Sequence, residues 1–275
     1  MVLSKELNDV LMEAAGIIDE ETQNIIDTGD ACVNWIKNYF TDNGDKDTVA
    51  VIGMSGGKDS LIAAALCVKA LGPKRVVGVM MPNGEQKDIN DAIAAIDYLG
   101  IQSVTMNIED AVEGVYDKLA GWFGITDTIK TNTPPRIRMT ILYAIANAVG
   151  GRVVNTSNAS ERFVGWSTKW GDGVGDLFPL VNLTVTELLE LGVHYLDLPR
   201  DLLFKAPDDG MTGKSDEENL GFTYEVLDKY IRGDEIPDVD TLQKIKDRHR
   251  ASRHKIVSGP SFVPCRGKFS RMGWF

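Results

Sequence analysis

The stretch TVAVIGMSGGKDSLIAAALCVKAL, residues 48–71, decides the fold of this chain. Its first part, residues 48–53, is a short apolar run rich in β-branched residues, which is typical of a strand buried on both faces. Residues 59–71 predict a helix, which Gly72 and Pro73 close. The segment between them is therefore a loop that leads from a buried strand into a helix.

Strands and helices alternate on the downstream side of this stretch. We predict further strands at residues 75–81, 103–108 and 152–156, and helices at 88–99, 110–123 and 134–149. In the last helix, Asn132 and Thr133 are candidate caps, and the prolines would lie in the first turn, where a missing N–H costs least. This alternation predicts an α/β protein with a parallel sheet sandwiched by helices, and ligands bind outside the carboxyl ends of such strands.

The two ends of the chain differ from this pattern and from each other. Residues 4–40 predict two helices, so we expect one domain over residues 1–275 with a helical N-terminal extension at 1–47. After Ser157 the alternation stops, and helices resume near 185–191, 222–231 and 239–251. A basic C-terminal tail at 241–275 carries nine Lys and Arg against one acidic residue. That tail could grip a small phosphorylated ligand or form a solvated helix, and the sequence leaves both open.

The composition excludes several classes of protein. Hydrophobic residues make up 43% and charged residues 25%, as in an ordinary globular protein. Cys32, Cys67 and Cys265 have no CxxC spacing, which argues against a zinc site or a disulfide framework and favours a reducing compartment. No apolar run approaches the ~20 residues of a membrane span, so we expect a cytoplasmic protein with no membrane partner. The net charge of −11 argues against nucleic acid as a partner.

The loop after the first strand has the chemistry of a phosphate site. Its backbone N–H groups face the carboxyl edge of the sheet, and the adjacent Gly56 and Gly57 allow close approach to an anion at a helix N-terminus. The spacing differs from a Walker A loop, because Asp59 follows Lys58. A carboxylate beside a polyphosphate would repel it unless a divalent cation lay between them, so Asp59 is a candidate Mg²⁺ ligand. The alternative is a plain Gly-rich turn with Asp59 as a helix cap.

This loop resembles the SGGxDS pyrophosphate loop of the N-type ATP pyrophosphatases, which implies an adenine nucleotide alpha-hydrolase-like, Rossmann-like fold. Segments downstream are similar to those of the ammonia-dependent NAD synthetases. They are T-x-x-x-x-E at 156–161, the G-[FY]-x-T-K-[FY]-G-D-G-like loop at 165–176 with Pro-Leu at 179–180, N-x-x-A-R-x-R-M at 132–139, D-E-x-x-L-G at 216–221 with Tyr224, and a His-Lys pair at 254–255. The resemblance covers about residues 20–257.

The resemblance implies roles for individual residues. Mg²⁺ would be held by Asp59 and Glu161, although a lone Glu after a strand is more often a helix-cap partner. Contacts to ATP would come from Gly53, Met54, Ser55, Gly56, Gly57, Lys58, Asp59, Ser60, Met81 and Thr156. Deamido-NAD would be met by Arg136, Lys169, Asp176, His254 and Lys255. Asp59, Lys169 and Asp176 would be the catalytic residues, while Arg138 could equally be a structural ion-pair partner.

The resemblance also implies a reaction. The carboxylate of deamido-NAD would attack the α-phosphorus of ATP and release pyrophosphate, and ammonia would then displace AMP to give NAD. Mg²⁺ would be the cofactor and a homodimer the assembly. Two departures from the family pattern stand out, because Val185 replaces a usual ATP-contacting lysine and Asp208 a usual Thr or Ser.

Two other functions remain open at the level of sequence. One is another N-type ATP pyrophosphatase, an adenylating ligase or a tRNA-modifying enzyme, which the acidic charge and the loop at 165–176 disfavour. The other is a non-catalytic adenine-nucleotide-binding protein, and the departures from the family pattern at Val185 and Asp208 are consistent with this alternative.

Overall fold

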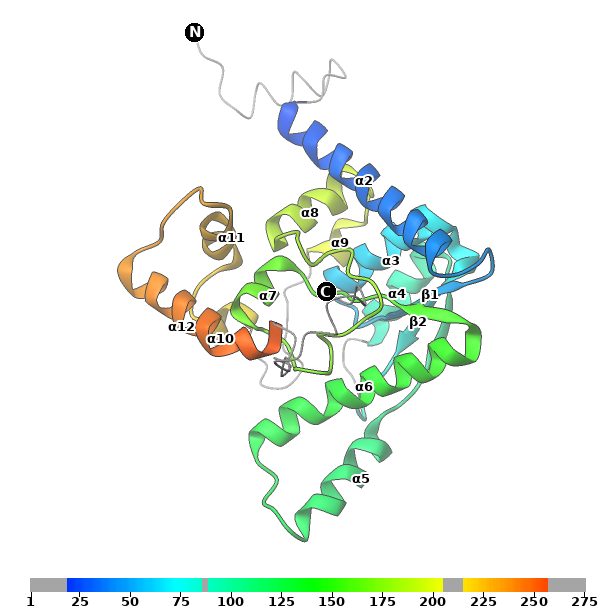
Figure 1. Ribbon diagram of the computed structural model, residues 1–275, viewed down its shortest axis with the longest axis vertical. Helices are drawn as coiled ribbons and strands as arrows, with labels where there is room; N and C mark the ends of the chain where they lie inside the picture. Colours follow the sequence, from blue (N-terminus) through cyan, green and yellow to red (C-terminus); the bar gives the residue numbers. More distant parts are fainter. Residues whose placement is uncertain (1–18, 86–88, 205–214, 257–275) are drawn as a thin grey trace, which may run out of the picture.

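A parallel four-stranded sheet forms the centre of the computed structural model, which describes residues 19–85, 89–204 and 215–256 (Figure 1). The strands lie in the order β3-β2-β1-β4, and their bounds are Val49–Gly53 (β1), Val76–Met80 (β2), Gln102–Thr105 (β3) and Gly151–Val153 (β4). β1 pairs in parallel with both β2 and β4. The predicted parallel sheet is confirmed, and the loop after β1 leaves from the middle of its carboxyl edge.

Burial follows the position of each strand in the sheet. All of β2 and the central residues of β1 are buried, as their continuous apolar sequences predict. β3 is exposed along its whole length, whereas β4, at the other edge of the sheet, is mostly buried. Alternate residues of β1 enter different apolar clusters, with Ala50 and Ile52 on one face and Val51 on the other.

Helices pack on both faces of the sheet, as expected. One apolar cluster joins the sheet to α2 (Glu20–Asp42), α3 (Lys58–Leu71), α4 (Ile89–Leu99), α8 (Val185–His194) and α9 (Arg200–Leu203). The opposite face is covered by α5 (Glu109–Ala120) and α6 (Asp127–Val149). A one-turn 3₁₀ helix, Pro73–Arg75, leads into β2.

A third group of helices builds its own small core beside the sheet (Figure 1). It consists of α7 (Ala159–Val164), α10 (Asp216–Leu220), α11 (Tyr224–Arg232) and α12 (Val239–Ile256). Val164, Leu227 and Ile245 meet there, together with Val185 from the start of α8. Because α7 follows β4, this group lies where the chain leaves the sheet.

The prediction for α6 is wrong at its N-terminus. The helix begins at Asp127 with Thr126 as the N-cap, so Pro134 and Pro135 lie inside it and Asn132 and Thr133 are not caps. Pro134 has no N–H to bond the carbonyl of Lys130, four residues earlier. The hydroxyl of Tyr116 on α5 donates to that carbonyl instead, at 3.3 Å. A neighbouring helix thus supplies the donor that the proline lacks.

Other boundaries differ by smaller amounts. The strands predicted at 103–108 and 152–156 are shorter, and beyond β4 the chain continues only as a bridge between Val154 and Leu177. The three predicted late helices are confirmed as α8, α11 and α12, while the short α7, α9 and α10 were not predicted. α2 accounts for the second predicted N-terminal helix, and the first lies mostly outside the described residues, as does the tail beyond residue 256. None of the described helices has the length and apolar character needed to cross a membrane.

Candidate active site

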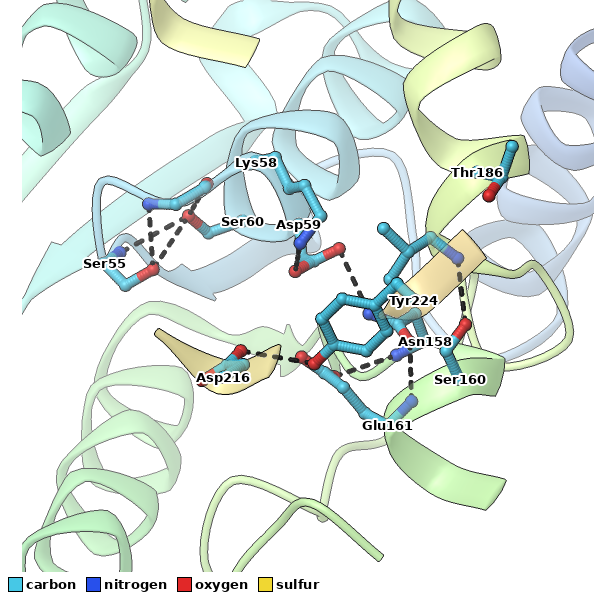
Figure 2. A network of polar contacts seen from close by, with 12 residues as sticks. Ser55, Lys58, Asp59, Ser60, Asn158, Ser160, Glu161, Thr186, Asp216 and Tyr224 are labelled. Carbon is cyan, nitrogen blue, oxygen red and sulfur yellow. Dashed lines mark hydrogen bonds and ion pairs between the residues drawn. The ribbon is translucent and has the colours of Figure 1, made fainter. Parts of the chain in front are cut away.

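The loop between β1 and α3 is held in shape by its own serines (Figure 2). Ser55 Oγ accepts a hydrogen bond from the N–H of Gly57 at 3.2 Å, and Ser60 Oγ donates to the carbonyl of Gly57 at 2.9 Å. Gly56 has φ = 86°, a conformation that residues with side chains rarely adopt. The N–H groups of the first turn of α3 have no partner within the helix, so the loop and helix together suit a phosphate.

Asp59 contacts both a residue of its own helix and the chain after β4. Gly57 is the N-cap residue of α3, and no side chain caps this helix, so the alternative of Asp59 as a cap is wrong. Asp59 Oδ2 is 3.1 Å from Lys58 Nζ, and Oδ1 accepts from Asn158 Nδ2 at 3.3 Å. The side chains of Lys58 and Asp59 are only 10% and 18% exposed, so this ion pair is largely shielded from water.

Asn158 joins the two predicted metal ligands. It is the N-cap of α7, where its side chain accepts from the N–H of Glu161 and Glu161 Oε2 accepts from the N–H of Asn158, a complete capping box. The same Asn158 donates its amide to Asp59. Glu161 is therefore a helix-cap partner, which is the commoner role of a lone Glu after a strand. Its capping bond uses only one carboxylate oxygen, Oε2.

Tyr224 and Asp216 close the other side of this group (Figure 2). The Tyr224 hydroxyl donates to Asp216 Oδ2 at 3.2 Å, and Lys58 Nζ lies 5.8 Å from the centre of the tyrosine ring. Burial raises the pKa of Tyr224, and the charges of Glu161, Asp216 and Asp59 raise it further. The tyrosine therefore stays protonated and keeps its hydroxyl as a donor.

The charges of Asp59, Lys58 and Glu161 are electrostatically coupled. Burial raises the pKa of Glu161 well above its ordinary value, and the nearby charge of Asp59 adds to this shift. Burial also lowers the pKa of Lys58, but Asp59 and Glu161 outweigh that effect and leave the pKa above its ordinary value. Among the described residues, the ammonium group of Lys58 thus interacts with the charges of Asp59, Glu161 and Asp216. The mutual repulsion of Asp59 and Glu161 is relieved when a cation binds to both.

The carboxylates of Asp59 and Glu161 suit a divalent cation that they share with other ligands. Within residues 19–85, 89–204 and 215–256, no three His, Cys, Asp or Glu side chains converge as a metal site. Asp59 and Glu161 would therefore have to share the ion with phosphate oxygens and water. Mg²⁺ is commonly bound in that way, by one or two carboxylates and the phosphates of the substrate.

Two of the residues predicted to meet the second substrate, Arg136 and Lys169, contact each other. Arg136, which is exposed on α6, donates from Nε to the carbonyl of Lys169 at 3.2 Å. Lys169 Nζ lies 5.5 Å from the ring centre of Trp170. The neighbouring Arg138 donates to the carbonyl of Met81 at 3.0 Å and has no ion-pair partner among the described residues. The structure thus brings Arg136 and Lys169 together.

The His-Lys pair at the end of α12 is split between two environments. Lys255 Nζ donates to the carbonyls of Gly165 and Ser167, at 2.9 and 2.7 Å, and so fixes the start of the loop at 165–176. His254 is exposed, and its Nδ1 contacts the carbonyl of Ala251 in its own helix. A Cβ at Gly165 would lie 2.0 Å from Ser252 Cβ, so only glycine permits this approach of α7 and α12.

Asp176 is tied to the sheet. One carboxylate oxygen accepts from the N–H of Val153 at 2.7 Å, and the other lies 3.4 Å from the hydroxyl of Tyr143. Its backbone N–H donates to the carbonyl of Val153. These contacts give Asp176 a structural place beside β4, and no described contact joins it to Asp59 or Lys169.

The remaining predicted residues border the phosphate loop or lie outside the described chain. Met54 and Met81 are buried at the carboxyl ends of β1 and β2, and Thr156 follows β4 two residues before Asn158. Val185 is 5% exposed within the third apolar cluster, so it cannot replace a lysine by contacting a ligand. Asp208 lies outside the described residues.

Sequence reasoning missed four residues of the site. Asn158 bridges Asp59 and Glu161. Asp216 and Tyr224 are hydrogen-bonded to each other beside this pair. Asp172 accepts from the N–H of Thr168, and its charge acts on Glu161 and Lys255. Asn158 could have been found, because Asn three residues before Glu is a capping-box pattern. Asp172, Asp216 and Tyr224 stood in the quoted motifs, but nothing local assigned them a position.

Comparison with known proteins gives consistent likenesses. A model of the NAD synthase family matches residues 29–258. An NH(3)-dependent NAD(+) synthetase of Alkaliphilus metalliredigens is 36% identical over 238 residues, 83% of this chain and 94% of that protein. The NMN synthetase structure from Francisella tularensis superposes with a TM-score of 0.78 at 34% identity and covers 87% of this chain and 98% of its own. An NH3-dependent NAD synthetase from Campylobacter jejuni shares the fold, with a TM-score of 0.72 at 23% identity over 90% of this chain and 100% of that one.

Proposed function

Because the chain belongs to the NAD synthase family, we propose that it is an ammonia-dependent ligase that amidates deamido-NAD at the expense of ATP. The products are NAD, AMP and pyrophosphate. The observation that carries this proposal is the contact of Asn158 with both Asp59 and Glu161, beside a loop shaped for phosphate.

The proposed chemistry begins with activation of a carboxylate, which has too poor a leaving group to react with ammonia directly. The carboxylate of deamido-NAD attacks the α-phosphorus of ATP, and the bond to the β-phosphate oxygen breaks. The loop from Ser55 to Ser60 receives the departing pyrophosphate through its N–H groups and the first turn of α3. Ammonia then adds to the acyl carbon of the adenylate, and AMP leaves.

The charges at the loop have defined tasks in this proposal. Asp59 and Glu161 would hold Mg²⁺, which offsets the negative charge on the departing pyrophosphate. Lys58 keeps Asp59 paired in the free protein and offers an ammonium group to the phosphates once nucleotide binds. Tyr224, held protonated, keeps the orientation of Asp216 fixed beside them.

The second substrate would be met by the opposite side of the site. Arg136 and Lys169 lie in contact on α6 and on the loop at 165–176, and both present cations to an anionic dinucleotide. A hollow of about 610 Å³ lies between α5 and α6 and is bordered by Asn83, Tyr116 and Lys130. Since Asn83 follows β2 at the same sheet edge as the phosphate loop, this hollow has room for part of that substrate. Asp176 would orient it only if its bond to Val153 opened.

A homodimer is the assembly that we propose. α6 is 23 residues long, yet it buries only Pro134 and Ala146 in the single chain. Trp122 and Phe123, between α5 and α6, are 85% and 65% exposed. An apolar surface of this kind is typical of a protein interface. We also assign the enzyme to the cytoplasm, since Cys32 and Cys67 are both free thiols.

The test is an incubation with deamido-NAD, ATP, Mg²⁺ and an ammonium salt. NAD, AMP and pyrophosphate should appear together in equal amounts, and each should depend on the other substrates. ATP binding without pyrophosphate release would instead favour the non-catalytic nucleotide-binding protein. Salt-sensitive binding of tRNA would favour a tRNA-modifying member of the superfamily.

A second candidate substrate follows from the likeness to the Francisella NMN synthetase. The same chemistry on nicotinate mononucleotide would give NMN. The two substrates share the carboxylate and differ in the adenylate half, so kcat/KM for each, measured under identical conditions, decides between them. We expect the higher value for deamido-NAD, and a higher value for the mononucleotide would reassign the enzyme.

A further inference from the structure

Asp228 is a buried carboxylate that has no part in the reaction described above. It lies on α11 and is only 4% exposed. Its Oδ2 accepts from both the N–H and the hydroxyl of Thr186, at 2.9 and 2.8 Å, and its Oδ1 accepts from the hydroxyl of Ser160 at 2.5 Å. A buried charge with three donors is held in one orientation, because leaving any donor unpaired in this interior is unfavourable.

Ser160 passes this constraint on to the active site. Its hydroxyl donates to Asp228 and accepts from the N–H of Val185 at 3.0 Å, so it is fixed from both sides. Figure 2 shows Ser160 next to Asn158 and Glu161. Ser160 precedes Glu161 in α7, and Asn158 is the N-cap of the same helix. α7 has only six residues, and fixing one buried side chain therefore fixes the rotation of the whole helix about its axis.

We propose that Asp228 is a positioning residue that acts through Ser160 to set the rotation of α7, and so aims Glu161 and Asn158 at Asp59. The inference rests on the proposed function, because it takes Glu161 as a metal ligand. Partners outside the ligand set that orient the ligands typically change metal affinity about 10- to 100-fold when they are removed. A backbone bond from the N–H of Ala159 to the carbonyl of Leu183 also holds α7, so removal of Asp228 should weaken metal binding rather than abolish it.

The molecule offers a matched control for a purely stabilising role. Arg232, one turn after Asp228 on α11, pairs with Glu187 on α8 and also donates to the carbonyl of Asn182. This link fastens α11 to α8 as Asp228 does through Thr186, but it does not touch α7. Arg232→Gln should therefore lower the melting temperature without altering metal binding.

The experiment measures the rise in melting temperature as Mn²⁺ is added at a fixed, saturating concentration of α,β-methylene-ATP, which cannot be cleaved. The half-saturating Mn²⁺ concentration is the readout. In Asp228→Asn, the amide oxygen can serve Thr186, but the amide NH₂ then faces Ser160, whose hydroxyl loses its acceptor. We expect about a 10-fold or larger increase for Asp228→Asn and for Ser160→Ala, and no further increase in the double variant. High Mg²⁺ should restore the kcat of both single variants.

The outcomes separate the inference from the function beneath it. Unchanged half-saturation in Ser160→Ala and Asp228→Asn, with only a lower melting temperature, would overturn the positioning role. Ser160→Ala retains the Thr186 contacts, so it carries the test if Asp228→Asn fails to fold. A half-saturation that Glu161→Gln leaves unchanged would instead remove Glu161 from the metal site, and the inference would fall with that part of the proposed function. An equal effect in Arg232→Gln would also overturn it.

Discussion

Asn158 shows at the scale of a residue how one side chain can serve both fold and site. Its oxygen caps α7, while its NH₂ group reaches Asp59 on another helix. The amide group suits this position because it offers an acceptor and donors together. An aspartate there could cap the helix equally well, but it would add a fourth negative charge near Asp59, Glu161 and Asp216.

Asp59 is the residue whose loss should affect catalysis most directly. We expect Asp59→Asn to lower kcat/KM at least about 100-fold, equivalent to ~2.7 kcal/mol in the barrier, because the charge that would hold Mg²⁺ is gone. Pyrophosphate release is the measurement. Asp127→Asn is the control, since Asp127 also lies in the first turn of a helix but is exposed and belongs to a different helix, α6. Full activity in Asp59→Asn would remove this residue from the metal site.

Cys32 makes a prediction about stability in alkali. Burial raises the pKa of its thiol from 9.0 to about 11. Above pH 9 the unfolded chain loses this proton and the folded chain keeps it, so the unfolded state is stabilised relative to the folded state. The contribution is fully present below pH 9 and is lost as the pH rises through about 11, at up to about 1.4 kcal/mol per pH unit.

Urea unfolding of the wild type and Cys32→Ser at several pH values tests this sign. The wild type should lose its advantage over the variant as the pH rises above 9, because serine does not ionise. Burial raises the pKa of Cys67 in both proteins, so this main cause of its shift is common to the two pH curves. Parallel pH curves for the two proteins would contradict the assignment.

α6 is the element in which local rules and tertiary structure disagree. Two prolines normally mark the start of a helix, yet this one begins seven residues before Pro134. The hydroxyl of Tyr116 supplies the donor that Pro134 lacks, so α5 and α6 depend on each other at this point. The helix can therefore carry Pro134 and Pro135 directly before Arg136.

This dependence predicts an energetic coupling between Tyr116 and Pro134. Tyr116→Phe should lower the free energy of unfolding by about 0.5–1.5 kcal/mol, because the carbonyl of Lys130 loses its donor. In the Pro134→Ala background the helix provides its own N–H, and the same substitution should have a much smaller effect. Urea unfolding of the four proteins in this double-mutant cycle gives the coupling. Equal losses in both backgrounds would show that the bond is not formed in solution.

The sequence predicted those elements whose apolar pattern is long or continuous. β1, α3, β2 and α4 were found within a few residues, because each is set by its own buried run. α7, α9 and α10 have six, four and five residues, too few to show a helical period. Asp59 and Glu161 could be named from motifs, but the contact of Ser160 with Asp228 spans 68 positions and leaves no local trace.

At the scale of the whole molecule, α5 and α6 stand apart from the other helices (Figure 1). They cover one face of the sheet, and their connection exposes Trp122 and Phe123 to solvent. The third helical group lies beside the sheet and supplies Tyr224 and Lys255 to the site. Within one chain, the third helical group thus packs beside the phosphate loop, whereas the surface formed by α5 and α6 stays exposed.

The proposed dimer can be tested on that uncovered side. We expect Trp122→Glu with Phe123→Glu to shift the protein from dimer to monomer in sedimentation velocity at micromolar concentration, with unchanged circular dichroism. Ile236→Glu is the matched control, because Ile236 is 77% exposed and lies between α11 and α12. A dimer that survives the double substitution would place the interface elsewhere, and a wild type that sediments as a monomer would remove the dimer altogether.

The ammonium group of Lys58, paired to Asp59 within the phosphate loop, has a practical consequence. A protein that carries its own counter-ion has no need of metal to remain folded. Washing with a chelator should leave its melting temperature unchanged, and binding should be ordered, with the metal arriving as a nucleotide complex.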